Sequence, residues 1–254
     1  MKKTKIFLFG ISGKMGKSVL ECSFSNKNLE VVGGFDFVQN MTLPTFSNIK
    51  NVNVDFDAII DFSRPETIDS VIALSEKTLK PVVIATTGFS DEERNRIVEL
   101  SKKVPVLLSS NMSVGVNVLQ KLVSLATKYL CGMSDIEIIE KHHNQKVDAP
   151  SGTARMILDS IEKAREEFCP SPPPCYGREG HDAKRQDNEV GVHAVRGGTI
   201  VGEHEILFCL NEEVVSIKHE ALSRKIFANG ALKAVEFIVG KKPKLYNMDD
   251  MLAK

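Results

Sequence analysis

Two histidines and a lysine in the middle of the chain carry the residue types needed to hold and protonate an anion. A histidine side chain ordinarily titrates near neutral pH, so the pair His142 and His143 offers a group that can donate a proton. Lys146 adds a fixed positive charge four residues after His142. The spacing predicts His142 and Lys146 as catalytic candidates for a small acidic substrate.

The residues that follow this pair can grip a carboxylate. A helix is predicted over about 154–168, and Ser151, Gly152 and Thr153 open it. Backbone N–H groups at a helix N-terminus bind anions. From spacing alone, a simple N-cap at Ser151 and a solvated histidine pair stay open as structural alternatives. Zinc is disfavoured, because no H-E-x-x-H motif or nearby Cys/His cluster supplies further ligands; we expect no metal.

A glycine-rich loop near the N-terminus is typical of dinucleotide binding. Its spacing is G-x-x-G-x-x-G, it follows the first apolar run, and Asp36 ends the second. Glycines allow a tight turn and close approach of a pyrophosphate, and an acid at the second strand suits the adenosine ribose. A tight turn with no ligand is the structural alternative. The predicted cofactor contacts in this region are Gly10, Ile11, Ser12, Gly13, Lys14, Met15 and Asp36.

The residues beside Asp36 bear on the choice between NADH and NADPH. A 2′-phosphate favours an arginine or lysine there, but Phe37 and Val38 follow the acid. The sequence therefore slightly favours NADH. Lys14 lies in the loop itself and can reach a 2′-phosphate, so NADPH stays open.

Short apolar runs alternate with helical patterns in the first half of the chain. Continuous apolar strands separated by helices indicate a parallel sheet covered on both faces, here an α/β domain of Rossmann type. Beyond residue 113 the strands lie closer together, which predicts a smaller α+β domain with an open mixed sheet. Gly197 and Gly198 are expected to form a hairpin turn between two of these strands.

Domain boundaries follow from this change of pattern. We predict a dinucleotide-binding domain over 1–112 and 223–254, and a substrate-binding and tetramerisation domain over 113–222. A last helix over 227–239 is expected to pack back on the first domain. The segment 169–188 contains four prolines and a charged run, which predict an exposed loop.

Composition narrows the class of protein. The 254 residues contain 33 lysines and arginines against 33 aspartates and glutamates, a balance that argues against nucleic-acid or membrane-surface partners. Five cysteines, an odd number without C-x-x-C, indicate reduced thiols and a cytoplasmic location. The apolar run Ile6–Phe9 is too short for an export signal or a membrane span.

The chain resembles the 4-hydroxy-tetrahydrodipicolinate (dihydrodipicolinate) reductase family along its whole length. The block Glu140–Ala154 is the most specific mark, and further marks are the glycine loop and the segments 60–63, 86–89, 111–117, 176–181, 195–204 and 219–230. The resemblance implies NAD(P)H-dependent reduction of a cyclic dicarboxylate to tetrahydrodipicolinate in lysine and diaminopimelate biosynthesis. It also implies a two-domain enzyme, usually a homotetramer.

The resemblance implies roles by motif position. His142 is similar to the proton donor and Lys146 to a second proton-donating or carboxylate-binding group. The implied substrate contacts are His143, Ser151, Gly152, Thr153 and Arg224. Further implied dinucleotide contacts are Ala85, Thr86, Thr87, Ser109, Ser110, Asn111 and Met112.

Three positions depart from the family pattern. Ala85 replaces a common glycine, Met112 replaces a common phenylalanine, and Asp36 with Phe37 replaces a Glu-Arg pair of some members. Two alternatives remain at this point: another NAD(P)-dependent oxidoreductase of a small dicarboxylate, and a non-catalytic NAD-binding regulator.

Overall fold

A computed structural model describes residues 3–40, 42–166, 168–169 and 172–253. The predicted loop proline Pro170 and the outermost residues of the predicted domains lie outside these. The chain divides into two compact units, Met1–Val114 with Arg224–Lys254, and Gly115–Ser223. The assignment of cofactor binding to one and of substrate binding to the other stays a prediction.

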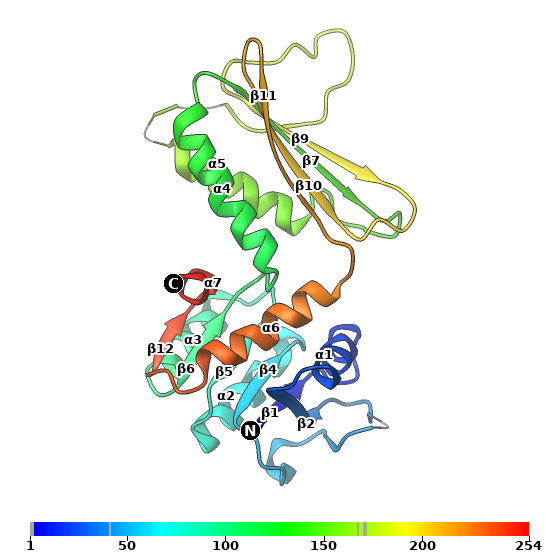
Figure 1. Ribbon diagram of the computed structural model, residues 1–254, viewed down its shortest axis with the longest axis vertical. Helices are drawn as coiled ribbons and strands as arrows, with labels where there is room; N and C mark the ends of the chain where they lie inside the picture. Colours follow the sequence, from blue (N-terminus) through cyan, green and yellow to red (C-terminus); the bar gives the residue numbers. More distant parts are fainter. Residues whose placement is uncertain (1–2, 41, 167, 170–171, 254) are drawn as a thin grey trace. The chain divides into compact units, whose positions relative to one another are not determined.

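The first unit is built on a seven-stranded, wholly parallel sheet, which confirms the predicted Rossmann-type architecture (Figure 1). The strand order is β12-β6-β5-β4-β1-β2-β3. The strands are β1 (Thr4–Phe9), β2 (Leu29–Phe35), β3 (Thr45–Phe46), β4 (Ala58–Asp61), β5 (Val82–Ile84), β6 (Pro105–Leu108) and β12 (Lys244–Tyr246). Strands β3 and β12 were not predicted, because they are too short to show an apolar run.

Helices cover both faces of this sheet because both faces are apolar. Along β1, Ile6 and Leu8 join one buried cluster and Phe7 and Phe9 the other, as the alternation of a strand requires. The first cluster includes side chains of α1 (Lys14–Phe24) and α6 (Lys225–Ile238), and the second those of α2 (Ile68–Thr78) and α3 (Asp91–Ser101). Short helices η1 (Ile49–Asn51), η2 (Pro65–Thr67) and α7 (Met248–Leu252) complete the unit.

The order of the central strands fixes where a ligand fits. Strand β1 pairs with β2 on one side and with β4 on the other. After β1 the chain adds β2 and β3 on one side, and then β4 and the later strands on the other, so the order of the strands switches at β1. Ligands of open α/β sheets bind outside the carboxyl ends of the strands at such a switch, so the loops after β1, β2 and β4 are the expected walls.

The second unit is a five-stranded mixed sheet with order β11-β10-β7-β9-β8, which confirms the predicted mixed sheet (Figure 1). Strand β10 is antiparallel to β7 and β11, whereas β7 and β8 are parallel to β9. Helices α4 (Val114–Leu130) and α5 (Gly152–Arg165) share its apolar core. The strands are β7 (Asp135–His142), β8 (Cys175–Tyr176), β9 (Val190–Arg196), β10 (Glu203–Cys209) and β11 (Val214–Glu220).

The predicted hairpin at Gly197 and Gly198 is wrong. Strands β9 and β10 are consecutive in the chain, but β7 lies between them in the sheet. The Gly197 N–H donates to the His142 carbonyl at 2.9 Å, and the Gly198 carbonyl accepts from the Asn144 N–H at 3.2 Å. The glycine pair therefore turns the chain beside the end of β7, next to the histidine segment. Within the described residues, no helix is long and apolar enough to cross a membrane.

Candidate active site

The first glycine of the loop is required by close backbone packing. Gly10 has φ +77°, and a Cβ on it would lie 2.5 Å from the Phe62 carbonyl oxygen. A Cβ on Gly16 would also clash with the backbone, because it would lie 2.1 Å from the Gly10 carbonyl oxygen. Side chains are therefore excluded at both positions, and the loop after β1 presents bare backbone at the start of α1.

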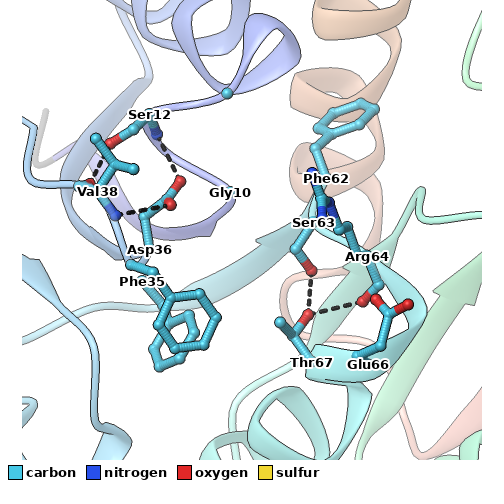
Figure 2. Close-up of a pocket in the computed structure, with 12 residues that line it drawn as sticks. Gly10, Ser12, Phe35, Asp36, Val38, Phe62, Ser63, Arg64, Glu66 and Thr67 are labelled. Atoms are coloured by element: carbon cyan, nitrogen blue, oxygen red, sulfur yellow. Dashed lines mark hydrogen bonds between the residues drawn. The ribbon is translucent and has the colours of Figure 1, made fainter.

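Asp36 lies against this loop, as Figure 2 shows. One carboxylate oxygen accepts from the Ser12 N–H at 3.0 Å, and the other accepts from the Val38 N–H at 3.2 Å. The Ser12 hydroxyl donates to the Val38 carbonyl at 2.6 Å. These bonds hold the acid at the carboxyl end of β2, where an acid can receive the ribose hydroxyls of a dinucleotide.

A cavity of about 590 Å³ opens beside Asp36. One wall comes from the predicted loops after β1 and β2, and the other from the segment after β4 (Figure 2). The sequence analysis missed this second wall. The sequence does show that this segment directly follows a buried apolar run, which is β4. Only the order of the strands, however, shows that β4 lies beside β1. The missed residues are Phe62, Ser63, Arg64, Glu66 and Thr67.

The remaining predicted cofactor contacts follow β5 and β6. The Ala85 N–H donates to the Asp61 carbonyl and the Ser109 N–H to the Ile84 carbonyl, so these loops begin at the carboxyl ends of adjacent strands. Thr87 and Ser110 are exposed, whereas Thr86 and Asn111 are buried. Two predicted contacts, Ile11 and Met112, are buried in the first core cluster.

In the first-unit loop, Lys14 is exposed at the first position of α1 and Met15 packs against the core. The predicted contact Arg224 also lies in the first unit, exposed at the N-cap position of α6. The structure thus places Arg224 in a different unit from the histidine segment.

The histidine segment of the second unit surrounds a buried carboxylate. Glu140 on β7 is 0% exposed, and His142 Nδ1 lies 2.6 Å from its Oε2. Arg196 on β9 donates to both carboxylate oxygens at 2.7 and 2.8 Å. The Ser151 N–H donates to Oε1 at 2.9 Å. Sequence analysis missed Glu140 and Arg196 as site residues.

A second buried imidazole stands next to the first. His204 on β10 is 4% exposed, and its ring centroid lies 5.3 Å from that of His142. Its Nε2 is 2.9 Å from the Ser151 hydroxyl, which also accepts from the Ala154 N–H and so caps α5. Burial, assisted by the charge of His142, lowers the pKa of His204 to about 4.

The pKa of His142 is also lowered. Burial is the largest cause, the charges of Lys146 and Arg196 act in the same direction, and the Glu140 carboxylate opposes them. A bound dianion would reverse this balance, because negative charge beside an imidazole favours its protonated form. The protonation of the ring therefore depends on the charge of any group that binds beside it.

Lys146 and the start of α5 are the other predicted anion-binding groups. Lys146 Nζ lies 2.7 Å from Asp148 Oδ1, and the Lys146 N–H donates to the His143 carbonyl. The first residues of α5 are Gly152, which is exposed, and Thr153. Among the residues that the structure describes, no three His, Cys, Asp or Glu side chains are grouped to hold a metal ion.

Two family descriptions match the chain. They are dihydrodipicolinate reductase, N-terminus, over residues 4–112, and dihydrodipicolinate reductase, C-terminus, over residues 115–252. The chain belongs to the dihydrodipicolinate reductase family. The expected family is thereby confirmed.

Relatives of this reductase family match over nearly the full length. The 4-hydroxy-tetrahydrodipicolinate reductase of Clostridium tetani is 46% identical, over 98% of this chain and 96% of the relative. That of Caldanaerobacter subterraneus is 47% identical, over 98% of each. Among solved structures, the dipicolinate-bound dihydrodipicolinate reductase from Paenisporosarcina sp. TG-14 is 25% identical with a TM-score of 0.80, over 98% of this chain and 99% of that one.

Proposed function

We propose that this chain reduces 4-hydroxy-tetrahydrodipicolinate to tetrahydrodipicolinate with NADH or NADPH, a step of lysine and diaminopimelate biosynthesis. The observation that carries the proposal is the cluster around His142, where a titrating ring, Lys146 and the N-terminus of α5 converge on one end of β7. A relative with the same fold binds dipicolinate, a planar cyclic dicarboxylate. The cluster offers what such a dianion needs: fixed positive charge, backbone donors and a proton source.

The cofactor would occupy the cavity of the first unit. The side-chain-free approach at Gly10 leaves space for a pyrophosphate, and Asp36 would receive ribose hydroxyls. The reduced nicotinamide supplies the hydride when bound. The predicted contacts after β5 and β6 would line its path.

NADH is slightly favoured because the exposed Phe37, rather than a cation, follows Asp36. Two cations are candidates for binding a 2′-phosphate: Lys14, exposed at the first position of α1, and Arg64 in the opposite wall of the cavity. Use of both cofactors is therefore consistent with the cavity.

In the second unit, each predicted residue has a separate task. His142 would donate the proton that follows hydride addition, while Lys146 would exchange Asp148 for a substrate carboxylate. The first N–H groups of α5, at Gly152 and Thr153, would bind the same anion. His143 and Ser151 are the further predicted substrate contacts in this unit, and Arg224, in the first unit, stays a prediction from the family resemblance.

The decisive experiment follows NADH oxidation at 340 nm with freshly prepared pathway substrate. We expect His142→Ala and Lys146→Ala each to lower kcat/KM by roughly 10²-fold or more. Exposed residues give matched controls, since His181→Ala and Lys163→Ala remove the same side chains away from the cluster. Wild-type rates in both site variants would overturn the roles. Dinucleotide binding without turnover would instead support the regulator, and turnover of another dicarboxylate the different oxidoreductase.

We further infer a homotetramer that uses the open face of the second sheet. Helices α4 and α5 share the core on one face, while Ile139 and Leu207 are half-buried and Val195 is exposed on the other. The apolar side chains on this face lie among charged ones such as Glu137, Lys141 and Glu203, and together they offer a surface for association. Light scattering after size-exclusion chromatography tests it, and a monomeric mass would contradict it.

The five free cysteines support a cytoplasmic location.

A further inference from the structure

The side chain of Glu140 is held by hydrogen bonds that its place on strand β7 alone does not explain. Its carboxylate accepts four hydrogen bonds: two from Arg196, one from the Ser151 N–H and one from His142 Nδ1. A fully buried acid is stable only when such donors replace water. Burial acts to raise the pKa of Glu140, but the bonds from Arg196, His142 and Ser151 outweigh it, so the pKa is lowered.

An ionised carboxylate can only accept hydrogen bonds, and this decides the state of the neighbouring ring. The hydrogen between Glu140 and His142 must lie on Nδ1. In neutral His142 the lone pair is then on Nε2, and this nitrogen takes up and releases the exchangeable proton. Gly202 stands beside it: a Cβ there would lie 3.0 Å from Nε2.

We propose that Glu140, held by Arg196, is a positioning residue that fixes the tautomer and the orientation of His142 so that Nε2 faces the substrate. This inference rests on the proposed function, because it concerns the proton donor of that reaction. Arg196 fixes the acid from the other side, since its guanidinium binds both carboxylate oxygens and the Asp148 carbonyl at 2.6 Å. Gly202 keeps the opposite edge of the ring clear.

The ionisation of His142 is set by groups from four elements. Glu140 lies on the same strand, Arg196 on β9, Lys146 in the following loop and His204 on β10. Only Glu140 among them stabilises the protonated ring. Its loss should therefore move the alkaline limb of the kcat/KM profile to lower pH, which a residue that only held strands together would not do.

Glu140→Gln is the direct test. Arg196 would hold the amide oxygen, so the amide nitrogen would donate to Nδ1 and shift the ring hydrogen to Nε2, the opposite tautomer. We expect kcat to fall about 10²-fold with KM for the substrate nearly unchanged, because only the transition state loses an interaction. Circular dichroism and NADH binding, the latter placed in the first unit, report whether the variant is folded.

Because Glu140→Gln leaves the half-buried Arg196 guanidinium without its carboxylate, a second variant keeps the test decisive. Gly202→Ala changes no charge and has no positive φ to strain, but it pushes on Nε2. A displacement of a few tenths of an ångström should lower kcat by about 10-fold. Gly197→Ala is the matched control, since a Cβ there meets nothing within 4 Å.

A double variant separates this inference from the proposed function. If Glu140 acts through His142, Glu140→Gln should lower kcat no further once His142→Ala is present. Multiplying effects would overturn the inference and leave the function intact, as would full activity in Glu140→Gln and Gly202→Ala. A wild-type protein without reductase activity, or an active His142→Ala, would instead refute the proposed function or the role of His142.

Discussion

The buried imidazole of His204 should make the protein lose stability on mild acidification. Its pKa of about 4 in the fold lies below the ordinary value of 6.5, because burial disfavours the charged ring. The unfolded chain therefore binds a proton that the folded chain excludes between these two values. The resulting stability is present above pH 6.5 and is lost as the pH falls through 4.

The magnitude follows from the size of the shift. A difference of about 2.5 pKa units corresponds to about 3 kcal/mol in full, of which about 2 kcal/mol should be lost between pH 7.5 and pH 5. The side chain is 4% exposed, so solvent screening removes little of it. Burial lowers the pKa of His142 and His219 as well, and their contributions have the same sign.

Comparison of the wild type with His204→Gln isolates the contribution of this ring. Glutamine can form a hydrogen bond with the Ser151 hydroxyl either as donor or as acceptor, so the cap of α5 can persist. Urea unfolding at pH 7.5 and pH 5, at one protein concentration, should show about 2 kcal/mol less acid destabilisation in the variant. His181→Gln, an exposed control, should behave as the wild type. Equal pH dependence in wild type and His204→Gln would refute the reasoning.

Three further substitutions have defined outcomes. Gly16→Ala should lower the free energy of unfolding by about 3 kcal/mol or prevent folding, because the new Cβ would lie 2.1 Å from a backbone oxygen. Thermal unfolding of this variant, with Gly197→Ala as the control, measures the loss. Arg64→Ala should raise KM for NADPH more than KM for NADH, and equal changes would remove Arg64 from 2′-phosphate binding. Glu137→Gln should speed proteolysis within 172–188, because Glu137 pairs with two arginines of that segment; an unchanged cleavage rate would contradict this.

The parallel sheet was predictable because its strands are buried on both faces. Runs such as Ile6–Phe9 and Val82–Ile84 are apolar at every position, which excludes a sheet with one solvated side. The order of the strands in the sheet was not predictable, because strands that pair lie far apart in the sequence. The wall after β4 was missed for this reason: nothing in residues 62–67 alone shows that β4 pairs with β1.

The second sheet shows the same limit more sharply. The glycine pair Gly197-Gly198 predicts that the strands on either side of it form a hairpin, yet six residues separate β9 from β10, and β7 lies between them and pairs with both. That insertion brings Arg196 to Glu140, 56 residues earlier in the chain. A partner at such a distance leaves no trace in local spacing.

The acid itself, however, was visible in the sequence. Ile136, Ile138 and Glu140 alternate along one predicted strand, so the carboxylate must share the face of two buried isoleucines. A carboxylate on an apolar face needs donors or a proton. That requirement, together with a histidine two residues later on the same face, predicts from the sequence that Glu140 and His142 are hydrogen-bonded. Glu140 is thus a buried charge two positions before His142, the predicted proton donor, and the role that we propose for it and its partners is to fix the tautomer of that ring.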